Sequence, residues 1–186
     1  MKEIDLSAQM ETSMKFKIVS FNTLSLQKHY SDVKGDPKLH NADVVCLQET
    51  CLMDSDKNKE KYNLREFESH FNGVGRGKGI ATFYSENFTF IKDIKMDSFQ
   101  ISKIESSEYS ILNVYRSNDA SMQFLHDLVS LIDLNKNTII CGDLNFCSIR
   151  ENDHKIGSYL KSLGFIQMVN EPTHREGQSL DICMFS

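Results

Sequence analysis

Long apolar runs are absent from this sequence of 186 residues. No stretch approaches the ~18 consecutive apolar residues of a membrane-spanning helix, which excludes a transmembrane protein. The first fifteen residues, Met1–Lys15, lack the apolar centre of a signal peptide, and we expect them to form a polar lead-in. Repeats, linkers and low-complexity tracts are also missing, so residues 16–186 are expected to form one domain. These absences predict an intracellular protein, in the nucleus or the cytoplasm, that is not secreted.

Paired cysteines and an excess of basic residues are absent too. The cysteines number five, and none of them forms a CxxC pair. This predicts free thiols in a reducing compartment and no zinc site. The net charge of −5 argues against a protein that coats nucleic acid, which needs a broad basic surface. It leaves room for a nuclease, because carboxylates with a divalent cation can engage a single phosphodiester.

What is present is a series of short apolar segments with the pattern of strands. They lie at residues 16–22, 44–47, 80–85, 88–95, 99–105, 109–115, 139–142, 165–169 and 180–185. The close spacing of the four segments between residues 80 and 115 predicts antiparallel pairing. Residues 23–41 are expected to form a loop or a broken helix, and residues 51–71 have weak helical character.

Two amphipathic helices are predicted near the end of the chain. Leu125, Leu128, Val129 and Ile132 fall on one helical face, and a second helix carries Ile156, Leu160 and Leu163 before Gly164. Strands with inserted helices favour an α/β (α+β) architecture of two packed sheets with helices on their outer faces.

The glycine-rich segment Gly73–Gly79 has two interpretations. It resembles a phosphate-binding loop, but no Lys-Ser/Thr pair or helical pattern follows it. A mobile hairpin approach to the next strand is the favoured interpretation.

The apolar run that begins at Ile139 ends in Gly142-Asp143-Leu144-Asn145. In an extended chain Asp143 and Asn145 would point the same way, and together they could orient a water or a leaving oxygen. The alternative is a strand followed by an ordinary Gly-Asp/Asn turn.

Other apolar strands also end in polar residues. If their ends share one edge, the resulting cleft holds acids, amides and a phenol, which suits a hard divalent cation with oxygen ligands. The residues concerned are Asn22, Glu49, Tyr115, Asn118, Asp143, Asn145 and Asp181.

These motifs, in this order, resemble the endonuclease/exonuclease/phosphatase superfamily, which has a DNase I-like fold and includes the apurinic/apyrimidinic endonucleases. The resemblance runs from about Phe16 to Phe185. The stretch from Leu163 through Pro172-Thr173-His174 to Asp181 is similar to endonuclease domains of mobile elements such as non-LTR retrotransposons and Helitron-like elements. The motifs are Ser20–Asn22, Ala42–Thr50, Asn113–Arg116, Gly142–Asn145 and Ser179–Asp181.

The resemblance implies a four-layer αββα sandwich and a Mg²⁺ cofactor, which Mn²⁺ could replace. Glu49 would bind the metal with help from Asn22, and Asp143 would position or activate the attacking water or the leaving group. Asp181 would orient a catalytic histidine.

The phosphate contacts implied by the resemblance involve further polar residues. Asn145 and Tyr115 would contact phosphate oxygens, while Asn22, Asn118 and Arg116 would bind substrate. Two alternatives stay open, because Tyr115 could be ordinary strand packing and Asn118 could cap the helix that begins near Ser121.

The sequence departs from the family pattern at two places. The family ends in a Ser-Asp-His motif on a last strand, whereas no histidine follows Asp181 here, so we expect a domain that is incomplete at its C-terminus. The neighbour of the missing strand would offer an exposed sheet edge for association. Apurinic/apyrimidinic endonucleases also carry an Asp two residues after the first-strand Asn, where this chain has Leu24.

Three functional hypotheses follow. The first is a Mg²⁺-dependent phosphodiester hydrolase, an endonuclease of mobile-element origin that acts on DNA and is weakened or inactive. The second is a non-catalytic remnant that binds nucleic acid or protein. The third is a phosphatase of the same superfamily with another phosphate substrate.

Overall fold

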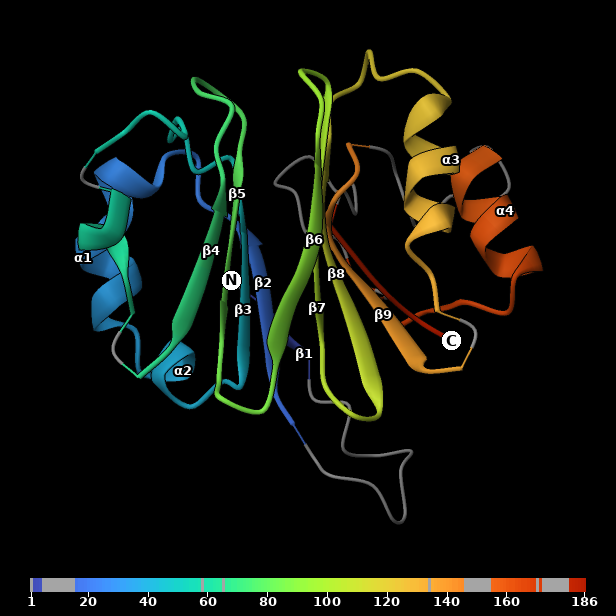
Figure 1. Ribbon diagram of the computed structural model, residues 1–186, viewed down its shortest axis with the longest axis horizontal. Coiled ribbons are helices and arrows are strands. Elements are labelled where there is room, and N and C mark those ends of the chain that lie inside the picture. Colours follow the sequence, from blue (N-terminus) through green and yellow to red (C-terminus); the bar gives the residue numbers. More distant parts are fainter. Residues whose placement is uncertain are drawn as a thin grey trace.

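Two β-sheets pack face to face in the computed structural model, and helices cover the outer face of each sheet (Figure 1). The structure describes residues 2–4, 16–57, 59–64, 66–133, 135–145, 155–169, 171 and 181–186. The layers follow the order helix, sheet, sheet, helix, so the predicted four-layer αββα sandwich is confirmed. Within these residues, no helix is long and apolar enough to span a membrane.

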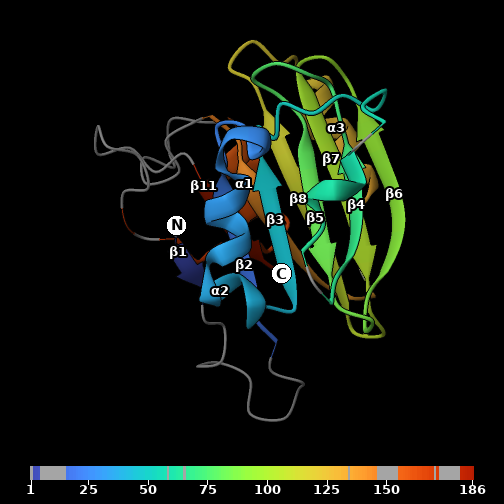
Figure 2. The same cartoon turned by 90° about the vertical axis from the view of Figure 1, so that its left-hand side faces the viewer.

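The first sheet has the strand order β1-β2-β3-β5-β4. Strands β2 and β3 are parallel, and the other neighbours are antiparallel. Its outer face packs on α1 and α2, which run beside β2 and β3 (Figure 2). The bounds of the elements in this half are β1 Lys2–Ile4, β2 Ile18–Asn22, α1 Leu26–Gly35, α2 Pro37–His40, β3 Val44–Gln48, the 3-10 helix η1 Lys59–Tyr62, β4 Glu68–Asn72 and β5 Ile80–Tyr84.

The second sheet has the strand order β10-β11-β9-β8-β7-β6. Strands β8 and β9 are parallel and the other neighbours are antiparallel. Helices α3 and α4 cover its outer face. The bounds are β6 Thr89–Lys95, β7 Phe99–Glu105, β8 Tyr109–Arg116, α3 Gln123–Ser130, β9 Asn137–Asp143, α4 Lys155–Ser162, β10 Ile166–Gln167 and β11 Asp181–Phe185.

The layer between the sheets changes from apolar to polar along the strands. Because alternate residues of a strand face the same side, pairing in register stacks like residues in rows across each sheet. The predicted site residues lie at one end of these strands. The row farthest from that end contains Ile18, Val44, Tyr84, Ile111 and Ile139. The middle row contains Ser20, Cys46, Thr82, Asn113, Cys141 and Cys183, and the row at the strand ends contains Asn22, Gln48, Tyr115, Asp143 and Asp181.

Several predicted elements differ from the structure. Strand 80–84 does not pair with strand 89–95, because the chain crosses from the first sheet to the second between them. Among the described residues between 51 and 71, only Lys59–Tyr62 is helical, and Glu68–Asn72 is a strand that the polar sequence does not indicate. The broken-helix interpretation of residues 23–41 is confirmed, since the break falls at Asp36, directly before Pro37.

Both predicted amphipathic helices are present with small shifts. The first buries Phe124 and Leu128 most deeply, while Leu125 and Ile132 pack at the margin of the same cluster. The second ends at Ser162, and Leu163 lies beyond it with 40% of its surface exposed.

The expected lead-in includes a short strand. Backbone pairing joins Lys2–Ile4 antiparallel to Ile18–Ser20, which places β1 at the edge of the first sheet. A composition-based boundary at residue 16 misses this strand, because edge pairing of three residues leaves no apolar pattern. An exposed edge that binds another chain stays a prediction.

Candidate functional site

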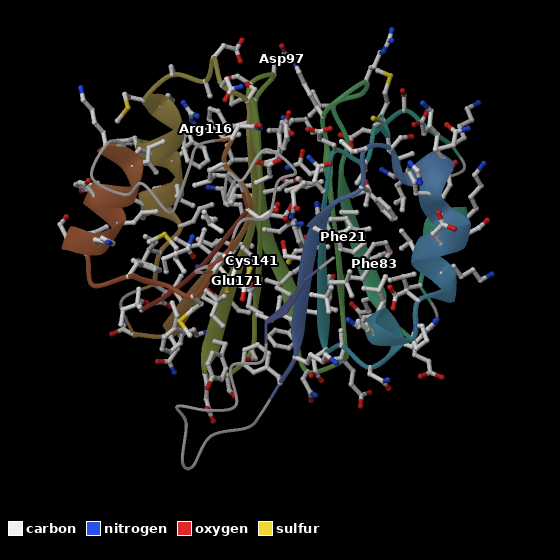
Figure 3. All side chains as sticks on the ribbon, turned by 180° about the vertical axis from the view of Figure 1, so that it is seen from behind. Phe21, Phe83, Asp97, Arg116, Cys141 and Glu171 are labelled. Atoms are coloured by element: carbon white, nitrogen blue, oxygen red, sulfur yellow. The ribbon has the colours of Figure 1, made fainter. Side chains whose placement is uncertain are left out.

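The polar residues that end the strands meet at one rim of the sandwich. Parallel strands β2 and β3 end there with Asn22 beside Gln48, and parallel strands β8 and β9 end there with Tyr115 beside Asp143. Antiparallel β11 begins at the same rim, with Asp181 directly opposite Asp143. Figure 3 shows this end of the molecule at the top, where Arg116 and Asp97 lie above Cys141.

A hydrogen bond joins the two sheets at this rim. The Nδ2 of Asn22, from the first sheet, donates to Oδ2 of Asp143, from the second, over 3.0 Å. The Oδ1 of Asn22 accepts the backbone N–H of Leu24 at 2.9 Å. These two contacts fix the orientation of the Asn22 amide and turn its donor group toward Asp143.

Asp143 lies in an environment that favours its neutral form. It is 4% exposed, and burial raises its pKa to about 6 from the ordinary 3.8. Hydrogen bonds from Asn22 and from the backbone N–H of Asn145 oppose this rise, while the charges of Asp181 and Glu49 add to it. A carboxyl group with such a pKa can exchange a proton near neutral pH.

Asp143 and Asn145 do not continue one extended strand, as the sequence interpretation assumed. Asn145 has a φ of 52°, and Oδ1 of Asp143 accepts the Asn145 N–H at 2.8 Å, which forms an Asx turn. The Nδ2 of Asn145 donates to the carbonyl of Arg116 at 2.8 Å. The turn interpretation is therefore right for the backbone, and the turn itself helps to hold the Asp143 carboxylate.

Glu49 follows the last residue of β3 with a left-handed φ of 49°. The loop after β2 runs alongside it, since the backbone N–H of Ser25 donates to the Glu49 carbonyl at 2.9 Å. Left-handed non-glycine residues gather here: Leu24, Ser25, Glu49, Cys51 and Asn145 have positive φ, and Glu66 is the one other case in the described chain. Clustered strain of this kind is characteristic of functional sites.

Tyr115 is buried between the two sheets at the rim. Its hydroxyl donates to the carbonyl oxygen of Gly77 over 3.2 Å. Burial raises the pKa of Tyr115, and the nearby carboxylates of Glu49 and Asp143 raise it further. The phenol therefore stays protonated and is a hydrogen-bond donor.

Arg116 and Asn118 lie just after the end of the Tyr115 motif. Arg116 is 8% exposed, and its guanidinium donates to the carbonyls of Leu144, at 3.3 Å, and Ala120, at 3.1 Å. These bonds connect the segments that follow β8 and β9. Asn118 is exposed in the turn before α3. The N–H of Gln123, the first residue of α3, donates to Oγ of Ser121 at 3.3 Å, so Ser121 and not Asn118 caps this helix.

The glycine-rich segment belongs to the same rim, which the sequence did not indicate. The backbone N–H of Gly77 donates to Sγ of Cys51 at 3.2 Å, and that of Gly79 donates to Oε1 of Gln100 at 3.1 Å. Lys78 pairs with Asp97 across 2.8 Å. With these amides already engaged, the segment is a hairpin connection rather than a phosphate-binding loop.

Four histidines fall in the described part of the chain. His29 adjoins the rim, because its backbone N–H donates to the Ser25 carbonyl at 3.2 Å and it lines a surface pocket together with Asn22 and Leu24. His29 is near Asp32 on α1, His40 contacts Lys34, His70 contacts Asp93, and His126 is on α3. The remaining two, His154 and His174, lie outside the described residues.

The donor chemistry of the rim fits a magnesium ion. Asp181 and Glu49 lie close enough to Asp143 for their charges to raise its pKa, and a bound cation would offset this repulsion. The described residues contain no group of three or more His, Cys, Asp or Glu side chains that could hold a metal ion. Mg²⁺ does not need one, since it keeps several waters and binds one or two carboxylates together with substrate phosphate.

Comparison with known proteins agrees with this arrangement. A family model described as "Endonuclease/Exonuclease/phosphatase family" matches residues 19–179. The fold is similar to an AP endonuclease from Archaeoglobus fulgidus, with a TM-score of 0.68 and 17% identity over 91% of this chain and 86% of that one. It is also similar to a 3'-5' exonuclease from Neisseria meningitidis, with a TM-score of 0.71 and 15% identity over 91% and 86% of the two chains.

The human Nocturnin catalytic domain with bound sulfate has a similar fold as well. Its TM-score is 0.63, with 15% identity over 91% of this chain and 82% of that one. At these identities the likeness is one of fold.

Proposed function

Because the chain belongs to the endonuclease/exonuclease/phosphatase family and has its hydrolase fold, we propose that it is a Mg²⁺-dependent phosphodiesterase acting on DNA. The observation that carries the proposal is the convergence at one rim of Glu49 and Asn22 from one sheet with Asp143, Tyr115 and Asp181 from the other. If these residues lay on separate faces of the molecule, they could not act on the same phosphate group.

In this proposal Glu49 is the main ligand of the cation, and Asn22 helps to bind it. A divalent cation bound there supplies positive charge that stabilises the negative charge developing on the phosphoryl oxygens. The fixed amide of Asn22 contributes a second effect, because its donor stabilises the ionised form of Asp143.

Asp143 is proposed to manage the proton of the attacking water or of the leaving oxygen. Its pKa near 6 lets it accept a proton at neutral pH and release it again. Asp181, directly opposite, raises that pKa and is also the residue predicted to orient a histidine. The protonated hydroxyl of Tyr115 has one hydrogen, which it can donate to a phosphate oxygen once it releases the Gly77 carbonyl.

The remaining site residues have supporting roles in the proposal. Asn145 retains an amide oxygen and a second N–H beside Asp143 and is proposed to contact phosphate. Asn118, exposed on the turn after β8, is proposed to bind substrate. Arg116, whose guanidinium donates to two backbone carbonyls, is proposed to act on substrate binding through the segments that it holds.

A mobile-element origin and a weakened activity also stay part of the proposal. The first is supported by the resemblance that starts at Leu163. The second is supported by Leu24, which is 66% exposed at the rim and offers no side-chain oxygen where related endonucleases have a carboxylate.

The proposal is tested with supercoiled, nicked and abasic-site DNA incubated with the protein and Mg²⁺. Glu49→Gln and Asp143→Asn are each expected to lower the cleavage rate by about 100-fold or more, the scale of losing one fixed electrostatic contact. Glu60→Gln, which alters an exposed acid on η1, is the matched control and should cleave like the wild type.

Three results of this experiment would contradict the proposal in different ways. Cleavage that survives both site variants would show that another site is responsible. Hydrolysis of a phosphate monoester such as p-nitrophenyl phosphate, without cleavage of DNA, would favour the phosphatase alternative. Salt-sensitive DNA binding without any cleavage would favour the non-catalytic alternative.

A further inference from the structure

A buried hydrogen bond joins the two sheets directly below the rim. The Nε2 of Gln48, the last residue of β3, donates to Oδ1 of Asn113, in the middle of β8, over 2.8 Å. Both side chains are 0% exposed. Glu49 follows Gln48 in the chain, and Tyr115 lies two residues beyond Asn113 on the same face of its strand. The pair therefore connects the strand that carries the proposed metal ligand to the strand that carries the phenol.

The direction of this hydrogen bond is fixed by a backbone carbonyl. The carbonyl oxygen of Ala81 can only accept, and the Nδ2 of Asn113 donates to it at 3.0 Å. The Oδ1 of Asn113 therefore faces Gln48, which must present its N–H group. The same Nδ2 lies 3.0 Å from Oγ1 of Thr82, so β5 holds Asn113 through the main-chain carbonyl of Ala81 and the side chain of Thr82.

Gln48 also carries an unpaired acceptor. Its Oε1 is fully buried and has no hydrogen-bond partner among the described residues. Burying a polar oxygen without a donor destabilises a fold, and an apolar side chain of the same size would avoid that cost. A glutamine at this position needs an explanation other than stability.

The backbone carbonyl of Gln48 also contacts the loop after β2, on the side of the rim that the first sheet forms. Its carbonyl accepts both the N–H and the Oγ1–H of Thr23, each at 2.9 Å. Thr23 directly follows Asn22, so a displacement of Gln48 would move Asn22 together with Glu49.

From these contacts we infer that Gln48 and Asn113 are positioning residues that set the placement of Glu49 and Asn22 relative to Tyr115 and Asp143. Neither residue touches the reacting atoms. The catalytic consequence of this inference rests on the proposed function, whereas its geometric consequence does not.

The geometric test uses Gln48→Met and Asn113→Leu, which keep approximate size and remove the polar groups. Nuclear Overhauser contacts between the Tyr115 ring and the α-protons of Gly77 are measured in the metal-free protein, because that pair spans the two sheets at the rim. Both variants should weaken these contacts, and the double variant should be no worse than the poorer single variant, since the two side chains form one link.

The matched control is Thr138→Val, which removes a fully buried polar group, a hydroxyl, at the opposite end of β9. It should lower the unfolding midpoint while leaving the Tyr115–Gly77 contacts intact. Should Asn113→Leu fail to fold, Thr82→Val removes only one acceptor of the Asn113 amide and should weaken the contacts by a smaller amount. Unchanged Tyr115–Gly77 contacts in Gln48→Met, together with unchanged contacts in either Asn113→Leu or Thr82→Val, would overturn the inference.

The functional readouts are Mn²⁺ binding, measured by electron paramagnetic resonance without substrate, and steady-state DNA cleavage. In Gln48→Met, the dissociation constant for Mn²⁺ should rise and kcat should fall by about tenfold or more with little change in KM, as expected for small misplacement of a catalytic group. Normal metal binding and kcat despite altered contacts would overturn the catalytic part. A wild type that neither binds Mn²⁺ nor cleaves DNA would instead refute the proposed function and leave the geometric result standing.

Discussion

Asp143 shows how a single residue can link the chemistry of the rim to the stability of the fold. Each of its carboxylate oxygens accepts one hydrogen bond, from Asn145 and from Asn22. Burial nevertheless outweighs these donors and raises its pKa to about 6. The native protein therefore holds this proton more tightly than the unfolded chain, whose carboxyl has the ordinary value.

This shift predicts an inverse dependence of stability on pH. Between about pH 4 and pH 6 the native state binds more protons at Asp143 than the unfolded state, so its stabilising contribution is complete at low pH and is lost as pH rises through the native pKa. The full contribution is on the order of 3 kcal/mol, from a shift of about two pKa units. Urea unfolding of metal-free wild type and Asp143→Asn across this range measures it.

The difference between the wild type and Asp143→Asn isolates the contribution of Asp143. The other carboxylates change the free energy of unfolding with pH in both proteins alike, so their effect cancels. The free energy of unfolding of the wild type should fall relative to Asp143→Asn as pH rises from 4 to 6. Parallel pH profiles would show that Asp143 titrates normally.

At the scale of elements, two glycines with positive φ are required for different reasons, one inside a strand and one just after a helix. Gly142, in β9, has a φ of 143°, and a Cβ there would overlap the carbonyl oxygen of Val114 on the neighbouring strand. Gly164 has a φ of 95°, and a Cβ there would meet nothing within 4 Å. At Gly164 the backbone closes α4, with its N–H donating to Lys161 and that of Phe165 donating to Leu160.

The two glycines therefore predict unequal effects of one substitution. Gly142→Ala should destabilise the protein by more than about 4 kcal/mol or prevent folding, because β8 and β9 would have to separate. Gly164→Ala should cost about 1 kcal/mol, because only the left-handed backbone conformation is penalised. Chemical unfolding of both variants tests the difference, and similar losses would refute the close strand contact at Gly142.

The whole molecule places its proposed metal ligand and its proton-transfer residue on different sheets. Glu49 belongs to the sheet covered by α1, and Asp143 belongs to the sheet covered by α3 and α4. A cation at the rim would therefore bind a geometry that exists only when both sheets are packed together. Unfolding would remove that geometry, so metal binding is coupled to the stability of the entire domain.

Addition of Mg²⁺ should consequently raise the unfolding temperature. At a concentration about 100 times the dissociation constant the stabilisation is about 2.7 kcal/mol. For a domain of this size that corresponds to an increase of roughly 5–10 °C. Differential scanning calorimetry with Mg²⁺ or with a chelator measures the effect, which Glu49→Gln should abolish.

The same measurement can detect a gain of affinity. Leu24→Asp adds a carboxylate at the rim, and an Asp tolerates the φ of 51° better than leucine does. This variant should show the Mg²⁺ stabilisation at lower concentration than the wild type. An unchanged concentration dependence would mean that residue 24 lies too far from the ion to bind it.

The sequence alone determined the architecture and most of the residues at the rim. Apolar runs that end in polar residues marked β2, β3, β8 and β9, since side-chain burial leaves a local pattern that can be read without coordinates. The amphipathic stripes of α3 and α4 were visible for the same reason.

Only the tertiary structure decided which elements lie together and what each polar group contacts. The hairpin segment at Gly77, the Leu144 carbonyl that holds Arg116, and the Gln48–Asn113 link all depend on partners from 28 to 65 residues away in the chain. The crossing from one sheet to the other between β5 and β6 was equally hidden, because pairing in either sheet would leave the same short strands. Local sequence records which side chains avoid water, whereas the packing of distant segments fixes where hydrogen-bond donors and acceptors meet.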